Sequence, residues 1–106
     1  MITDEQAEAA NDFIRDNADK LAKAKAERIY LEEFRKSKKA LLFQDAPDGT
    51  IQSKESYAYA HKDYQELLNG LKAAVEIEEN LKWMIVAAQT KIELYRTQQA
   101  NTRRGY

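Results

Sequence analysis

Apolar residues recur every three to four positions along most of the chain, which is the period of an amphipathic helix. The first such stretch predicts a helix over about residues 3–43, because neither Gly nor Pro occurs before Pro47. At its start, Thr3 and Gln6 have the spacing of a capping box, in which each side chain bonds the other residue's amide. The apolar face of this helix is expected to comprise Ala10, Phe13 or Ile14, Leu21, Ala24, Leu31, Phe34 and Leu41 or Leu42.

One strong helix breaker, Asp45-Ala46-Pro47-Asp48-Gly49-Thr50, follows this helix. Proline fixes its own φ and glycine tolerates positive φ, so the segment predicts a turn, within a turn and linker over about residues 45–62. Ser53 and Ser56 are candidate N-caps for a short extra helix, and residues 57–61 fit either a short helix or an extended link. A small β-hairpin that pairs residues 41–44 with residues 50–52 is the less favoured alternative.

The clearest heptad pattern lies in a second predicted helix, over about residues 63–104. Asn69-Gly70 marks either a kink in this helix or a break between a short helix and a long one. Heptad spacing is typical of a helix that packs along one seam against a partner helix. The seam consists of Tyr64, Leu71, Glu78, Ile85, Ile92 and Gln99 at one position, and Leu67, Ala74, Leu81, Ala88, Tyr95 and Thr102 at the other.

Charge changes sign along the chain and favours an antiparallel pairing of the two helices. Residues 1–19 have a net charge of -5, residues 20–39 of +5, residues 40–95 of -4 and residues 96–106 of +3. An antiparallel pairing brings opposite charges together, whereas a parallel one brings like charges together. The predicted fold is therefore an all-α, coiled-coil-like antiparallel helical hairpin that forms a single helical domain over residues 1–106.

Two further expectations follow from this hairpin. Residues whose numbers add to about 108 should lie abreast, which places Arg28 within one turn of Glu78 as a structural ion pair that fixes register. One partner helix is too small to cover all the apolar side chains, so a homodimer that forms a four-helix bundle is expected. A candidate apolar patch, which belongs to the dimer contact or to the core, comprises Leu81, Trp83, Met84 and Ile85.

The composition argues against catalysis, cofactors and membrane insertion. The 106 residues include no Cys and one His, His61, so nucleophiles and metal ligands are few. Neither a glycine-rich phosphate loop nor the Glu-x-x-His pattern of helical di-metal sites occurs. No run of about 18 apolar residues is present, and the acidic N-terminus lacks the apolar core of a signal peptide. We therefore predict a protein that is not an enzyme and has no cofactor, metal or membrane partner.

Two basic clusters make nucleic acid the alternative partner. The first comprises Arg35, Lys36, Lys38 and Lys39, and the second comprises Arg96, Arg103 and Arg104. Such side chains bind phosphates, and Tyr30, Tyr95 or Tyr106 would stack on bases. The net charge of -1 favours intramolecular neutralisation instead, because dedicated nucleic-acid binders are usually basic. In that case the second cluster is expected to pair with Asp4, Glu5, Glu8 and Asp12.

Four blocks of the sequence resemble a family of small helical phage and prophage proteins: AKAERIYLEEFRKS at 24–37, YAYAH at 57–61, LKW at 81–83 and YRTQQAN at 95–101. Such proteins are often encoded near phage recombination or single-strand-binding genes, which implies the cytoplasm of an infected or lysogenic bacterial host. The expected function is that of a non-catalytic accessory protein, which binds an unidentified protein partner in phage DNA metabolism or host-defence evasion. The alternatives are direct DNA binding through the basic clusters and a structural coiled-coil assembly unit.

Overall fold

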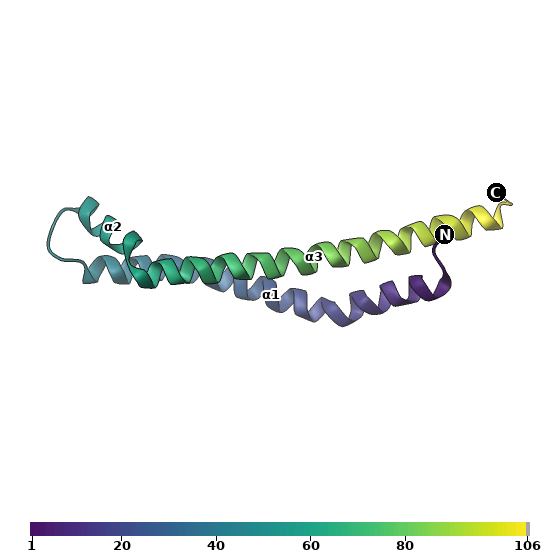
Figure 1. The fold of residues 1–106 in the computed structure, drawn as a ribbon, viewed down its shortest axis with the longest axis horizontal. Coiled ribbons are helices and arrows are strands. Elements are labelled where there is room, and N and C mark those ends of the chain that lie inside the picture. Colours follow the sequence, from purple (N-terminus) through teal and green to yellow (C-terminus); the bar gives the residue numbers. More distant parts are fainter. Residues whose placement is uncertain (106) are drawn as a thin grey trace. The chain divides into compact units, whose positions relative to one another are not determined.

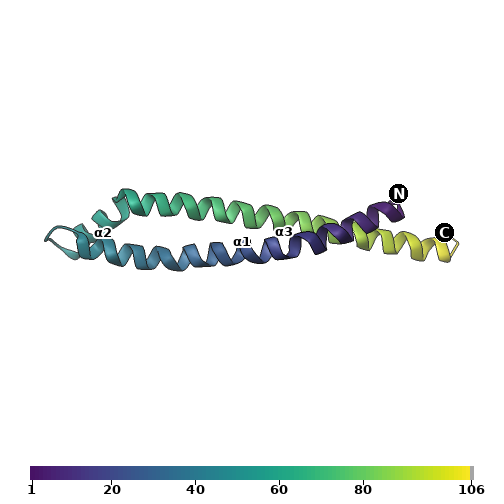
Figure 2. The same ribbon diagram turned by 90° about the horizontal axis from the view of Figure 1, so that it is seen from below.

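The computed structural model of the protein describes residues 1–105 and consists of three α-helices (Figure 1). Helix α1 spans Asp4–Asp45, α2 spans Ile51–Ala60 and α3 spans Lys62–Arg103. The predicted all-α helical hairpin is confirmed, because α1 and α3 run in opposite directions (Figure 2). No strand occurs among residues 1–105, so the β-hairpin considered within residues 41–52 does not form.

Helix α1 begins with the predicted capping box. The Thr3 amide donates to Gln6 Oε1 at 3.0 Å, and the Gln6 amide donates to Thr3 Oγ1 at 3.1 Å. The helix ends at Asp45, close to the predicted end. It stops there because Pro47 disfavours the helical conformation of Ala46 and has no amide hydrogen to donate.

The N-cap of α2 is Thr50, and not Ser53 or Ser56 as predicted. Thr50 has extended backbone angles, and its Oγ1 accepts a hydrogen bond from the Ser53 amide at 3.0 Å. An N-cap must bond an amide two or three residues further on, and Thr50 is the first residue after the turn that does so. The short extra helix therefore begins earlier than the serines indicate, at Ile51.

His61 links α2 to α3 as a single extended residue. Its amide donates to the Ala58 carbonyl at 3.3 Å, and its Nδ1 accepts from the Asp63 amide at 3.0 Å. The same residue thus ends one helix and caps the start of the next. Of the two interpretations of residues 57–61, the helical one holds as far as Ala60 and the extended one holds for His61.

Helix α3 keeps the predicted heptad seam and continues without a break at Asn69-Gly70. The helix continues from Lys62 to Arg103. Apart from the adjacent residues and the backbone of its own turns, nothing lies within 4 Å of the position that a Cβ of Gly70 would occupy. The seam could be predicted from the sequence because its residues recur at regular heptad spacing. Among its twelve residues only Thr102 is exposed, six are half-buried, and five are buried: Tyr64, Ala74, Glu78, Ile85 and Ala88.

Helix α1 has a seam of the same spacing, but near its C-terminal end the seam differs from the predicted face. Phe34 and Leu41 are 37% and 54% exposed, so they lie outside the seam. Strict heptad spacing places Arg35 and Lys38 in the seam instead, and it selects Leu42 over Leu41. The buried and half-buried positions with this spacing are Ala7, Ala10, Ile14, Asn17, Leu21, Ala24, Arg28, Leu31, Arg35, Lys38 and Leu42.

Contacts divide the chain into two compact units. Unit 1 contains Met1–Lys23 and the described part of Glu78–Tyr106, where the first half of α1 pairs with the second half of α3. Unit 2 contains Ala24–Ile77, where the rest of α1 pairs with α2 and the first half of α3. The single helical domain predicted over residues 1–106 stays a prediction.

The core of unit 2 is a small cluster to which all three helices contribute. Leu42 of α1, Ala58 of α2 and Tyr64 of α3 are buried in it, and Leu68 packs against them. Ala58 is 0% exposed. A ten-residue helix is marginal in water by itself, so these contacts are what hold α2 in place.

The helices pair in a register different from the predicted one. In unit 1 the Ile2 amide donates to Gln98 Oε1 at 2.9 Å, and in unit 2 Lys38 Nζ lies 3.7 Å from Asp63 Oδ2. Residues abreast therefore have numbers that add to about 100 in each unit, and not to 108. The prediction centred the turn in the linker, whereas α2 folds back and packs against the end of α1.

Candidate functional site

Unit 1 carries an open apolar groove between α1 and α3. Four alanines, Ala9, Ala10, Ala87 and Ala88, face it from the two helices, together with Phe13 and Met84 near one end and Gln6 and Lys91 near the other. Its volume is about 370 Å³. On each helix the lining residues have the spacing i, i+3, i+4 and i+7, so each helix presents one continuous face to the groove.

The predicted patch of Leu81, Trp83, Met84 and Ile85 does not form one surface. Ile85 is buried and Leu81 is half-buried, and both belong to the seam of α3. Trp83 is 60% exposed, and it lies on the opposite side of the helix because it follows Leu81 by about 200° of rotation. Met84, 46% exposed, is the one member of the patch that lines the groove.

Trp83 makes local polar contacts along its own helix. Its indole Nε1 donates to Glu79 Oε2 at 2.9 Å, and Lys82 Nζ lies 5.3 Å from the ring centroid. The exposed indole is therefore bordered by one carboxylate and one ammonium group. This pattern is that of an amphipathic side chain at a helix surface and not of a core residue.

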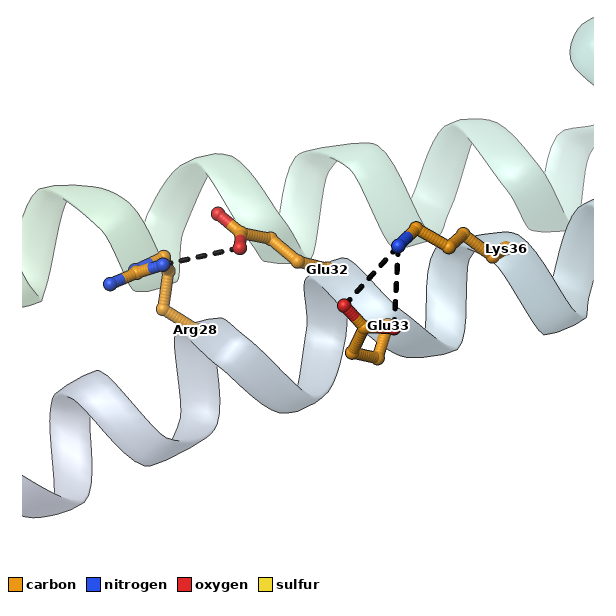
Figure 3. Close-up of polar contacts among 4 residues, drawn as sticks. All are labelled: Arg28, Glu32, Glu33 and Lys36. Atoms are coloured by element: carbon orange, nitrogen blue, oxygen red, sulfur yellow. Dashed lines mark hydrogen bonds and ion pairs between the residues drawn. The ribbon is translucent and has the colours of Figure 1, made fainter.

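Two ion pairs lie along α1 in unit 2 (Figure 3). The half-buried Arg28 places a guanidinium nitrogen 3.1 Å from Glu32 Oε2, and the exposed Lys36 places its Nζ 3.3 Å from Glu33 Oε1. Glu78, the predicted partner of Arg28, is 9% exposed on α3 in unit 1. The Arg28–Glu78 ion pair stays a prediction.

The other lysines of the first basic cluster contact groups of α2 and α3. Lys38 pairs with Asp63, as described above, and Lys39 Nζ lies 4.6 Å from the ring centroid of Tyr59. A hydrogen bond between the Lys39 and Tyr59 side chains raises the pKa of Lys39 above its ordinary value. Lys39 therefore stays positively charged at neutral pH.

Arg35, Lys36 and Lys39 line a cleft of about 420 Å³ in unit 2 together with Tyr59 and Tyr64. The two tyrosine rings meet edge to face at a centroid distance of 5.4 Å. The three cations were predicted as candidate site residues from the sequence, whereas the two tyrosines were not. The signal available for Tyr59 was the aromatic YAYAH block, which the folding back of α2 brings to the basic cluster. Tyr64 was visible only as the first residue of the predicted seam of α3.

The second basic cluster remains at the surface. Arg96, Arg103 and Arg104 are exposed, and among residues 1–105 none of them forms an ion pair with Asp4 or the other acidic residues of α1. Asp4 instead accepts a hydrogen bond from the Tyr95 hydroxyl. This bond, with a smaller effect of desolvation, raises the pKa of Tyr95. The expected pairing of this cluster with the acidic N-terminal segment is therefore wrong for the described residues.

The three tyrosines proposed for base stacking have different surroundings. Tyr30 is 61% exposed and stacks on Phe34 at a centroid distance of 5.9 Å. Tyr95 is half-buried and bonded to Asp4, which makes it less accessible to a ligand. Tyr106 lies outside the described residues.

No other arrangement of reactive groups stands out in the part of the chain that the structure describes. Residues 1–105 contain no cluster of three or more His, Asp or Glu side chains placed to hold a metal ion. His61, the one histidine, bonds the Asp63 amide and lies at the junction of two helices. None of the helices of residues 1–105 combines the length and the apolar character needed to cross a membrane.

Comparison of the chain with protein-family models, with curated proteins and with solved structures gives no match. The resemblance to phage proteins, and the bacterial host that it implies, therefore stay predictions.

Proposed function

We propose that the protein is a non-catalytic binding protein. The groove of unit 1 binds a pair of helices that belongs to a macromolecular partner. The observation that carries this proposal is the groove itself, whose lining is almost entirely apolar and open to solvent. Exposed apolar surfaces on soluble proteins commonly mark interaction sites. The rows of residues spaced by three and four positions along the groove match the ridges of another helix.

The dimensions of the side chains favour a closely packed helix in the groove. Ala9, Ala10, Ala87 and Ala88 leave room for a partner backbone to approach, while Phe13 and Met84 supply larger apolar contacts. Gln6 and Lys91 provide polar groups at the other end of the groove. An apolar centre with polar groups at its margin is the usual arrangement of a protein interface.

The occupant that we propose is a second copy of this chain, which makes a four-helix arrangement. Residues 1–19 contain six acidic residues and one basic residue, whereas residues 80–105 contain five basic residues and one acidic residue. Among the described residues no ion pair joins these two segments within the chain. Asp12 and Asp16 pair with Arg15, and Asp19 pairs with Lys23, within α1. The remaining net negative charge of residues 1–19 is therefore available to the basic segment of a second copy.

Charge also selects the symmetry of the proposed dimer. A two-fold axis that crosses the helices would place residues 1–19 on the same acidic residues of the second copy. A two-fold axis that runs along the helices places residues 1–19 on residues 80–105 of the second copy, so opposite charges meet. Like charges at an interface are costly, so we propose the second arrangement.

Light scattering on purified protein tests this proposal with one groove variant and one matched control. The wild-type protein is expected to have twice the 12.2 kDa mass of the chain at about 1–100 µM. Ala87→Glu buries a charge in the interface and should give a monomer, whereas Thr90→Glu adds the same charge at an exposed position outside the groove and should leave the dimer intact. A monomeric wild-type protein, or equal effects of the two variants, would contradict the proposal.

The phage setting implied by the sequence resemblance is kept as a separate proposal. It predicts that the gene lies near phage recombination or single-strand-binding genes. The neighbourhood of the gene in its genome tests this directly, and a location among unrelated bacterial genes would contradict it.

A further inference from the structure

The cleft of unit 2 brings together three cations and two aromatic rings without a carboxylate among its lining residues. Arg35 and Lys36 reach it from one turn of α1, Lys39 from the next, Tyr59 from α2 and Tyr64 from α3. Lys36 also pairs with Glu33, which lies outside the lining, whereas no ion pair within residues 1–105 compensates Arg35 or Lys39. Positive charge is therefore concentrated in one place on a chain whose net charge is -1. Such local concentration is what attracts an anionic ligand to a protein that is not basic overall.

Arg35 is the cation whose situation is hardest to explain by folding alone. It is half-buried in the seam of α1, and it forms no hydrogen bond or ion pair with the other residues that the structure describes. Arg28 and Lys38, the other half-buried cations in this part of the seam, pair with Glu32 and Asp63. The planar guanidinium group of Arg35 thus has its donors available for a bidentate bond to a phosphate.

Lys39 and Tyr59 form the second half of the cleft. The ammonium group lies over one face of the tyrosine ring, at 4.6 Å from its centroid. The Tyr59 side chain is still 44% exposed, and the edge of the Tyr64 ring packs beside it. An exposed aromatic ring next to cations is the combination that proteins use to bind a base and its phosphate together.

We propose that this cleft binds single-stranded nucleic acid, with phosphates on Arg35, Lys36 and Lys39 and a base stacked on Tyr59. Duplex DNA is the poorer ligand because its bases are already stacked and their faces are not available to a tyrosine ring. A site of this kind tolerates different bases, since every base has an aromatic face. The proposal is independent of the dimer, because all of these residues belong to unit 2.

Fluorescence anisotropy with a labelled oligo-thymidylate of about 20 nucleotides tests the proposal over a salt series. Three phosphate contacts predict a slope of log K against log salt of about -2, and Arg35→Gln should reduce it to about -1.4 while weakening binding. Tyr59→Ala should weaken binding about tenfold without changing the slope, and Tyr59→Phe should restore most of the affinity because it keeps the ring. Arg96→Gln, which removes an exposed arginine of unit 1, is the matched control and should have no effect.

A second variant and two competition measurements complete the test. Arg35 lies in the seam, so Lys36→Gln, at an exposed position, provides a second variant that leaves packing unchanged, and circular dichroism checks the fold of each. Competition with tripolyphosphate separates nucleic acid from a simple anion, and a duplex of equal length separates single strands from double strands. Absent binding, equal affinity for the duplex, full competition by tripolyphosphate at matched charge, or equal effects of the Arg35 and Arg96 variants would each overturn the proposal.

Discussion

Replacing Leu42 by alanine is expected to release α2, because this side chain forms the α1 part of the unit 2 core. Leu42 is 5% exposed and packs with Ala58 and Tyr64. Removing a buried leucine side chain costs its transfer free energy and the energy of the cavity, about 2–5 kcal/mol in total. The cluster is small and close to solvent, so its walls can relax, and we expect about 2–3 kcal/mol.

Leu41→Ala provides a matched control, since it removes the same atoms one residue away. Leu41 is 54% exposed, so about half of its apolar surface is already in water and no closed cavity remains after truncation. The expected loss is at most about 1 kcal/mol. Both variants change the composition and the helix propensity equally. The difference between their free energies of unfolding therefore reports the burial of Leu42 alone.

Urea unfolding followed by circular dichroism gives the two free energies by linear extrapolation. Amide hydrogen exchange locates the effect, and the amides of α2 should lose protection first in Leu42→Ala. Equal losses in the two variants, or a larger loss for Leu41→Ala, would refute the reasoning. Either result would mean that α1 presents a different face to α2 from the one described here.

Three other substitutions test separate features of the fold by urea or thermal unfolding. Gly70→Ala should stabilise the protein by about 1 kcal/mol, because the added methyl group meets nothing within 4 Å beyond the adjacent residues and its own helix backbone; a loss of stability would mean that the site is crowded. Tyr95→Phe removes a bond whose contribution is fully present below the ordinary tyrosine pKa of 10.0 and is lost as pH rises through the raised folded pKa. The free-energy difference between wild type and Tyr95→Phe should therefore shrink above about pH 10, and a constant difference would contradict this assignment. Glu78→Ala should cost about 3–5 kcal/mol if the predicted pair with Arg28 is buried, whereas exposed Glu79→Ala should cost little; an unchanged melting temperature would remove the pair.

The features that sequence predicted correctly depend on neighbours within one or two helical turns. The capping box needs only Thr3 and Gln6, and its two hydrogen bonds are both present. The seam of α3 is visible because apolar residues hold their spacing over about five heptads and only a few polar residues interrupt it. Fold class follows from these local signals together with the charge order.

The predicted apolar face of α1 was wrong where long cationic side chains occupy seam positions. Arg35 and Lys38 occupy seam positions with their aliphatic stems half-buried, which a scale of apolar residues scores as surface. The same scale favoured Phe34 and treated Leu41 and Leu42 as equivalent, although strict heptad spacing from Ala24 selects Leu42. The predicted register was wrong for a different reason. The turn was centred within the linker, and the possible short extra helix there was given no packing face against the end of α1.

The residues of the cleft could not be assembled from sequence because they come from three helices. Its cations form a visible basic run, but Tyr59 and Tyr64 reach that run only when α2 folds back on the end of α1. The Tyr30 ring, which sequence offered for stacking, instead packs on Phe34 of its own helix. Separation along the chain therefore did not indicate which aromatic ring contacts which cation.

The core of unit 2 and the proposed binding cleft depend on the same short helix. Ala58 is the most buried residue of α2, and its neighbour Tyr59 faces Lys39, so the packing of one residue sets the position of the next. Leu42→Ala replaces no residue of the cleft, although Leu42 packs against Tyr64, which lines it. We expect this variant to bind single-stranded DNA more weakly, because the loosened α2 no longer holds Tyr59 beside the cations. Leu41→Ala should keep both the helix and the affinity. Retained affinity in a Leu42→Ala protein whose α2 has lost exchange protection would show that Tyr59 does not belong to the site, and would leave the phosphate contacts of α1 as its whole basis.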